Sequence, residues 1–252
     1  MAETGFRLLL LGPLEAQVDG KVVAVPAGRP TVVLAVLGLA GGRPVATEAL
    51  ADRVWGDQLP QRVRPSLASL VLRLRRSLGV GVIETVPSGY RLDVAPEQVD
   101  LLQFRGLVRQ AAAADPAAAR ALLDEALGLW RGEPLAGIRS EALERELPRL
   151  AEEWVGARQA RIRLDLASGR YAEAVEPLRD LLARHPLREP FWQQLITALA
   201  GAGRHAEALE AYAELRVRLR EELGADPSAE LQRLHQTILT GTAAGPDVVP
   251  AR

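Results

Sequence analysis

Short runs of β-forming residues fill most of the first 25 positions of the chain. These runs are Phe6–Leu11, Leu14–Val18 and Lys21–Val25. Turn-forming pairs separate them, and the pair Asp19-Gly20 is a strong signal for a two-residue β-hairpin. The pattern therefore predicts three small strands, the last two of which form a hairpin.

Three short helices and a second hairpin are predicted next. A helical run begins at Thr31 and ends at Gly41-Gly42, and Thr47 is a good N-cap for a helix over 48–55. A third helix is expected over 65–78, because a proline suits the first turn of a helix. Two β-forming runs then flank a Pro-Ser-Gly turn: Val82–Val86 and Tyr90–Val94. The order of strands, three helices and a hairpin is that of a winged helix-turn-helix.

Strand signals disappear after Val99, and helical periodicity takes over. The predicted helices are 101–114, 116–130, 140–147, 149–168, 171–184, 190–202, 204–223 and 227–240. The chain is thus expected to be mainly α-helical, with a small β-sheet and a wing hairpin in its N-terminal part. We expect a DNA-binding domain over residues 1–95, an all-α domain over 96–240 and a disordered tail over 241–252.

An internal repeat lies within the helical region. The segment GRYAEAVE, which starts at Gly169, recurs as GRHAEALE, which starts at Gly203, 34 residues later. That offset is the period of the tetratricopeptide helix pair. The glycine turns the chain between antiparallel helices, and the two alanines let those helices approach closely. Pro177 departs from the pattern, and we expect a kink there because proline removes one helical hydrogen bond.

Composition narrows the possible classes of protein. With 48% apolar and 25% charged residues, the chain has the composition of a soluble globular protein. It has no cysteine, which excludes disulfides, thiol nucleophiles and thiolate metal sites. No apolar run is long enough to span a bilayer, and the N-terminus is too acidic for a secretory signal. We therefore expect a cytoplasmic protein with no membrane partner.

The charge distribution singles out one helix. The net charge is only −1, yet residues 61–83 contain five arginines and no acidic residue. On the helix 65–78, a stripe of Leu67, Leu70, Val71, Leu74 and Leu78 should face the core, which leaves the arginines on the opposite face. Such a helix suits the major groove of double-stranded DNA. The candidate DNA-binding residues are Arg62, Arg64, Ser66, Ser69, Leu72, Arg73, Arg75, Arg76, Ser88, Tyr90 and Arg91.

The same cluster has a simpler interpretation. Arginines opposite a leucine stripe are often only the solvated face of an amphipathic helix. The surrounding winged-helix order of elements favours DNA binding. Leu72, which cannot form a hydrogen bond with its side chain, keeps the alternative open.

No constellation in the sequence supports an enzyme, a metal site or a cofactor site. The three histidines are isolated, and no glycine-rich loop is followed by the Gly-Lys-Ser/Thr of a phosphate loop. Acidic residues lie beside arginines at helical spacing, as surface ion pairs do. The four tryptophans fall in helical patterns, where core packing is the expected role.

Several motifs resemble a known family. The segments that start at Gly42, Leu74 and Pro87 (GRPVATEALADRVWGD, LRRSL and PSGYRL) look like the OmpR-type winged helix. The segments ALGLWRGEPL, HPLRE, AGRHAEAL and ELGADP, which start at Ala126, His185, Ala202 and Glu222, are similar to the bacterial transcriptional activation domain. Together they resemble the SARP family, the Streptomyces antibiotic regulatory proteins, up to about residue 239.

The resemblance implies a transcriptional activator of a secondary-metabolite gene cluster. Family members bind promoter direct repeats, usually as homodimers on DNA, and recruit RNA polymerase. This chain departs from the family in its third helix, where Ala68 replaces a common glutamine and Leu72 replaces a serine. One alternative is therefore a tetratricopeptide-like interaction scaffold whose winged helix has lost DNA binding. The sequence also leaves the choice between activator and repressor open.

Overall fold

The first strands form a small antiparallel sheet. The computed structural model describes residues 5–240. The strands β1 (Arg7–Leu9), β2 (Glu15–Val18) and β3 (Lys21–Val23) pair in that order. Asp19 and Gly20 both have positive φ, at 50° and 75°, which is the geometry of the expected two-residue hairpin. Each strand has fewer residues than the run of β-forming residues that predicted it.

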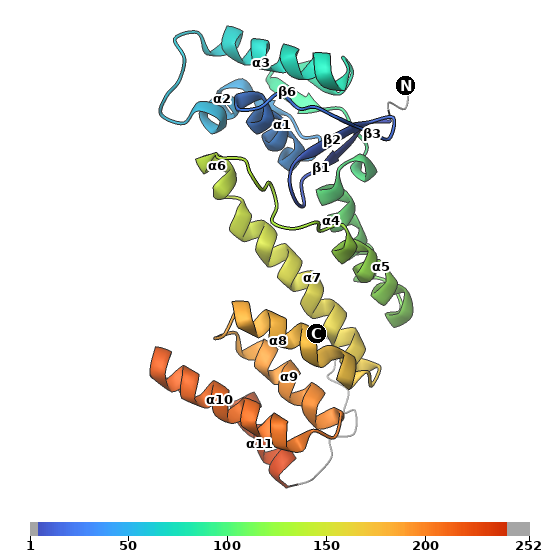
Figure 1. Cartoon of the computed structure of the whole chain (residues 1–252), viewed down its shortest axis with the longest axis vertical. Coiled ribbons are helices and arrows are strands. Elements are labelled where there is room, and N and C mark those ends of the chain that lie inside the picture. Colours follow the sequence, from blue (N-terminus) through green and yellow to red (C-terminus); the bar gives the residue numbers. More distant parts are fainter. Residues whose placement is uncertain (1–4, 241–252) are drawn as a thin grey trace. The chain divides into compact units, whose positions relative to one another are not determined.

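The winged helix-turn-helix predicted from the sequence is present (Figure 1). Its helices are α1 (Arg29–Ala40), α2 (Thr47–Trp55) and α3 (Val63–Leu78), and its hairpin consists of β5 (Ile83–Val86) and β6 (Gly89–Leu92). A two-residue strand that the sequence did not indicate, β4 (Val45–Ala46), pairs with β6 and completes a second sheet. Three predicted helix starts are wrong: α1 begins at Arg29, with Pro30 in its first turn, Thr47 lies inside α2 without capping it, and α3 begins at Val63, two residues before Pro65.

After β6, every named element in the described part of the chain is a helix, as predicted. These helices are the short 3₁₀ helix η1 (Pro96–Gln98), α4 (Asp100–Ala111), α5 (Pro116–Gly128), α6 (Glu141–Glu144), α7 (Leu147–Ala167), α8 (Tyr171–Arg184), α9 (Glu189–Gly201), α10 (His205–Leu223) and α11 (Ala229–Leu239). Pro177 lies inside α8, which continues across it. None of the helices in residues 5–240 is both long and apolar enough to cross a membrane.

Asp100 joins the first sheet to the helical region. Its side chain, only 2% exposed, accepts hydrogen bonds from the backbone amides of Leu10 and Leu11 at 2.7–2.9 Å. Burial raises the pKa of this carboxyl group, although the amide hydrogen bonds and Arg131 act in the opposite direction. The amides of Arg131 and Leu135 in turn donate to the carbonyls of Leu11 and Leu10, at 2.7 and 3.1 Å. A buried carboxylate and backbone hydrogen bonds thus connect the residues just after β1 to the start of α4 and to the loop between α5 and α6.

These connections affect how the chain divides into compact units. Among the described residues, the first unit ends at Ala157 and the second begins at Arg158, so the division falls within α7. The helices α4, α5 and α6 therefore belong to the same compact unit as the winged helix. The expected boundary near residue 95 separates a DNA-binding domain from an all-α domain, and it stays a prediction. The predicted tail over 241–252 lies outside the described residues.

In the C-terminal unit, the two copies of the predicted repeat form equivalent hydrogen bonds. Gly169 and Gly203 both adopt positive φ, at 72° and 77°. After each glycine, the next backbone amide donates to the carbonyl five residues earlier, at 2.9 Å in the first repeat and 2.8 Å in the second. Ala174 and Ala208, 34 positions apart, are fully buried. The two tetratricopeptide-like units therefore turn and pack in the same way.

Candidate nucleic-acid interface

The helix α3 is held in place by the apolar stripe on its inner face. Leu67, Val71, Leu74 and Leu78 are exposed by 2% or less, as expected for a core-facing stripe. Leu70, which was assigned to the same stripe, lies at its edge and remains half-buried. The anchored stripe directs the opposite face of α3 toward solvent.

The exposed face of α3 gathers much of the predicted site. Ser69, Leu72, Arg73 and Arg76 are all exposed there, with Ser66 half-buried beside them, and Arg62 is exposed directly before the helix. Within residues 5–240, the guanidinium groups of Arg62, Arg73 and Arg76 make no hydrogen bond or ion pair. They are therefore available to an anionic partner without the loss of an internal contact. We call Arg62, Arg73 and Arg76 the free arginines.

Three other arginines of the predicted site already have partners in the protein. Arg75 donates to the carbonyl of Ile83 at 2.8–2.9 Å and to Thr85 Oγ1 at 2.8 Å. These bonds tie α3 to the strand β5, so the role of Arg75 in the fold is to position the wing. This interaction could not be read from the helix alone, because its acceptors belong to the strand that follows.

Arg91 and Arg64 are paired with acidic residues. Arg91 Nε lies 2.6 Å from Glu84, which stands directly opposite it on β5. Arg64 lies 3.3 Å from Glu48 in α2. Two hydrogen bonds to the Glu48 carboxylate hold its pKa below the usual value. The larger effect comes from a backbone amide at the start of α2, and the smaller one comes from Arg64. The predicted three-residue turn would set Glu84 opposite Leu92. In the structure Gly89 belongs to β6 and pairs with Val86, so the turn has two residues and Glu84 stands opposite Arg91.

The wing is short and packs against the start of α2. Gly89 pairs with Val86 across the turn, and the carbonyl of Ser88 accepts a bond from the Thr47 amide at 3.1 Å. A Cβ on Gly89 would lie 2.0 Å from the carbonyl oxygen of Val45, so only glycine fits there. Ser88 is exposed, whereas Tyr90 is half-buried. Of the three wing residues in the predicted site, Ser88 alone is therefore fully accessible.

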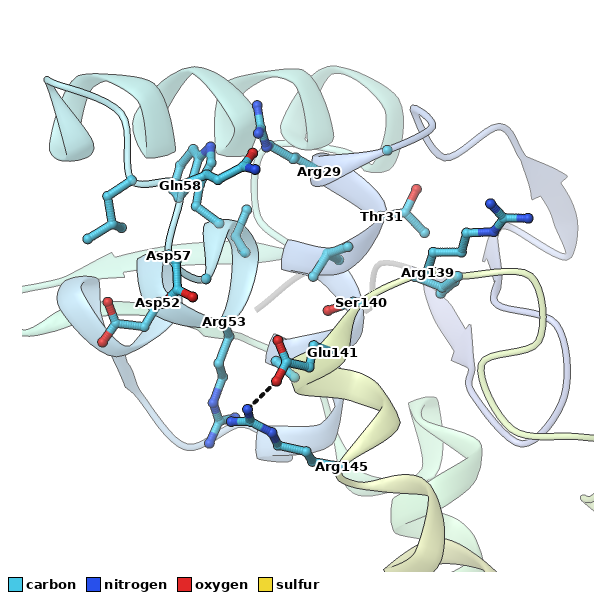
Figure 2. Close-up of a pocket in the computed structure, with 18 of the residues that line it drawn as sticks. Arg29, Thr31, Asp52, Arg53, Asp57, Gln58, Arg139, Ser140, Glu141 and Arg145 are labelled. Carbon is cyan, nitrogen blue, oxygen red and sulfur yellow. Dashed lines mark hydrogen bonds and ion pairs between the residues drawn. The ribbon is translucent and has the colours of Figure 1, made fainter.

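A separate cavity of about 1290 Å³ lies beside α2 (Figure 2). Its walls come from the start of α1, the segment 52–59 and the segment 137–145. Figure 2 shows the bond between Glu141 and Arg145 at this cavity. The guanidinium of Arg29 lies 5.8 Å from the centre of the Trp55 ring. Charges of both signs line this cavity, so it is a polar cleft, unlike the acid-free face of α3.

Comparison with known proteins identifies the family. The model of the bacterial transcriptional activator domain matches residues 99–239. The regulatory protein DnrI of Streptomyces peucetius is 36% identical over 264 residues, and the alignment covers 96% of each chain. The chain belongs to the SARP family of transcriptional regulators. The resemblance seen in the sequence motifs is thereby confirmed.

Other SARP relatives extend beyond the region they share with this chain. The regulatory protein AfsR of Streptomyces coelicolor is 37% identical over 243 residues, which cover 94% of this chain and 24% of AfsR. A solved structure of Mycobacterium tuberculosis EmbR in complex with a low-affinity phosphopeptide is 34% identical, with a TM-score of 0.86. That match covers 95% of this chain and 66% of the EmbR chain. The arrangement of a winged helix followed by helices is therefore shared with a solved SARP relative.

Proposed function

We propose that this SARP-family regulator binds promoter DNA in a sequence-specific manner and activates transcription from it. The observation that supports this proposal is the set of free arginines on the exposed face of an anchored helix. A helix held by its inner stripe can enter the major groove, where arginines bind phosphates and guanine edges. Arg62, Arg73 and Arg76 serve this purpose, and Ser66, Ser69 and Ser88 supply short hydroxyl contacts.

In this proposal, each of the two expected domains has its own binding partner. Residues 1–95 bind the DNA, and residues 96–240 contact RNA polymerase and a second protomer. The target is a direct repeat in a promoter of a secondary-metabolite gene cluster, with one protomer of a homodimer on each copy. Three arginines of the site are paired within the protein: Arg64, Arg75 and Arg91. Each of them reaches a phosphate only by sharing or giving up its present partner.

The test is fluorescence anisotropy with promoter fragments from the gene neighbourhood of the protein. The full chain should bind one fragment far more tightly than a scrambled fragment of equal length, and added salt should weaken both. A reporter gene driven by the bound promoter should be transcribed more when the protein is present. Equal affinity for the cognate and scrambled DNA would contradict the proposal, and reduced reporter transcription would indicate a repressor.

A second candidate function is a tetratricopeptide-like scaffold whose winged helix contacts protein. It is favoured by the internal pairing of Arg64 and Arg91 and by the leucine at position 72, exposed by 49%. Under this alternative, replacement of Arg73 and Arg76 by alanine leaves the regulatory activity in cells unchanged. Under DNA binding, the same double variant loses that activity.

A further inference from the structure

Leu72 is the large apolar side chain on the outer face of α3. It is 49% exposed, whereas the stripe on the inner face is buried almost completely. Its neighbours one turn away on the helix are Ser69 and Arg76, and Arg73 follows it directly. Exposed leucines are common on protein surfaces, so exposure alone indicates nothing. The position is what matters, since Leu72 lies in the middle of the face that carries the free arginines.

The chemistry of the major groove restricts what such a side chain can meet. Base edges there present hydrogen-bond donors and acceptors at every position, apart from one apolar group, the C5-methyl of thymine. A leucine pressed against a donor or acceptor would remove water from that group without replacing its hydrogen bond. Against the thymine methyl, the same side chain buries apolar surface on both partners.

We infer that Leu72 is a specificity-determining residue that selects thymine at one position of each half-site, through contact with the C5-methyl group. This inference rests on the proposed function, since it requires α3 to lie in the major groove. Ala68, one turn before Leu72, is also exposed, and its small side chain leaves room for the leucine to approach the base. Serine at position 72 would lose this preference, because a hydroxyl group offers the methyl little apolar surface.

The test removes only the methyl group. A preferred site is first selected from a random duplex library with the full-length protein, and each thymine is then replaced singly by deoxyuridine. With the wild-type protein, one replacement per half-site should weaken binding about fourfold, which is the effect of one buried methyl group. With Leu72→Ala, the same replacement should leave the dissociation constant unchanged.

A matched control distinguishes this contact from general effects of deoxyuridine on the duplex. Leu59, in the segment between α2 and α3, is exposed by the same 49% but does not belong to α3. Leu59→Ala should retain the full fourfold sensitivity to the missing methyl. Thermal unfolding should give both variants the midpoint of the wild type, since neither side chain is buried.

The outcomes separate the inference from the function it rests on. If the wild type selects no sequence from the library, the proposed function is overturned, and the inference with it. If it selects a site but no single deoxyuridine weakens binding, the role of Leu72 is overturned and DNA binding stands. The same conclusion follows if Leu72→Ala keeps the sensitivity of the wild type.

Discussion

Several arginines of the C-terminal unit pair with acidic residues, whereas three arginines in and just before α3 do not. In the C-terminal unit, Arg179 and Arg204 share Glu207, and Arg218 pairs with Glu214 at 3.0 Å. On α3, the free arginines Arg62, Arg73 and Arg76 have no such partner within the described residues. Both regions are rich in arginine, so the number of arginines does not distinguish them. The difference lies in the acids, which are absent from residues 61–83.

This difference indicates separate roles for the two sets of charges. An exposed ion pair in water contributes little to stability and presents almost no net charge to a partner. An unpaired arginine on a rigid helix carries its full charge to a phosphate and releases counterions when it binds. The acid-free stretch, rather than the arginine content, thus supports the proposal that this surface meets DNA.

The largest expected effect comes from removing two of the free arginines. The double variant Arg73→Ala/Arg76→Ala should lose about 1000-fold in affinity for the cognate site, at ~2 kcal/mol for each of the two contacts. If both arginines contact phosphates, the slope of log K against log[salt] should also fall by about 2. Titrations at several salt concentrations measure both quantities.

The matched control is the double variant Arg163→Ala/Arg216→Ala, which removes two exposed arginines of α7 and α10. It should leave both affinity and salt slope near the wild-type values. Equal losses in the two double variants would mean that total charge, and not the α3 face, determines binding.

The next effect is on folding and leaves the DNA-facing charges untouched. Asp100→Ala removes the acceptor for the Leu10 and Leu11 amides, which would remain buried without a partner. The unfolding free energy should fall by about 3 kcal/mol, at ~1–3 kcal/mol for each unsatisfied group. Denaturant unfolding measures this loss, and cognate affinity should persist at temperatures where the variant is folded. An affinity loss in the fully folded variant would show that α3 depends on this distant anchor.

The pH dependence of stability gives a second measure of Asp100. Because its pKa in the folded protein is raised, the folded state holds this proton to a higher pH than the unfolded chain does. Its contribution to stability is therefore greatest below about pH 4 and is lost as the pH rises through the folded pKa. The stability of Asp100→Asn relative to wild type should accordingly increase with rising pH.

A smaller effect is expected at Arg75, an arginine of α3 that is bound internally. Arg75→Ala removes its bonds to Ile83 and Thr85, and should lower the unfolding free energy by about 2 kcal/mol. Its effect on the salt slope should be smaller than that of Arg73→Ala, measured in the same titrations. Equal salt effects from the two single variants would show that Arg75 leaves the strand to bind DNA.

The smallest effect should come from freeing an arginine in the C-terminal unit. Glu207→Gln removes the ion-pair partner of Arg204, whereas Arg179 loses Glu207 but keeps Glu176. Because the pair is exposed, thermal unfolding should be nearly unchanged, and DNA affinity should not increase. A gain in affinity would contradict the view that only the α3 face meets the DNA.

Local patterns predicted the fold well, because helix periodicity and turn residues act over a few positions. The Asp19-Gly20 hairpin and the 34-residue repeat are confirmed in detail. The strand β4 was missed because two residues carry no periodicity. Asp100 was not recognised as an anchor because its partners, Leu10 and Leu11, lie some 90 residues away.

The candidate site was predictable only in part, for a related reason. Its exposed face followed from the leucine stripe, so Arg73, Arg76 and Leu72 were placed correctly on the outside of α3. Whether an arginine is free depends on its neighbours in space, and these came from other elements in the case of Arg64 and Arg75. Direct contact with DNA stays a prediction for every residue of the site.

The central claim is that the free arginines of α3 bring this regulator to specific promoters. The most direct test is genome-wide DNA occupancy of the tagged full-length protein beside its Arg73→Ala/Arg76→Ala variant, at equal expression. We expect discrete promoter peaks that share a direct repeat and vanish in the variant. A folded wild-type protein with no peaks, or a variant with the same peaks, would contradict the claim.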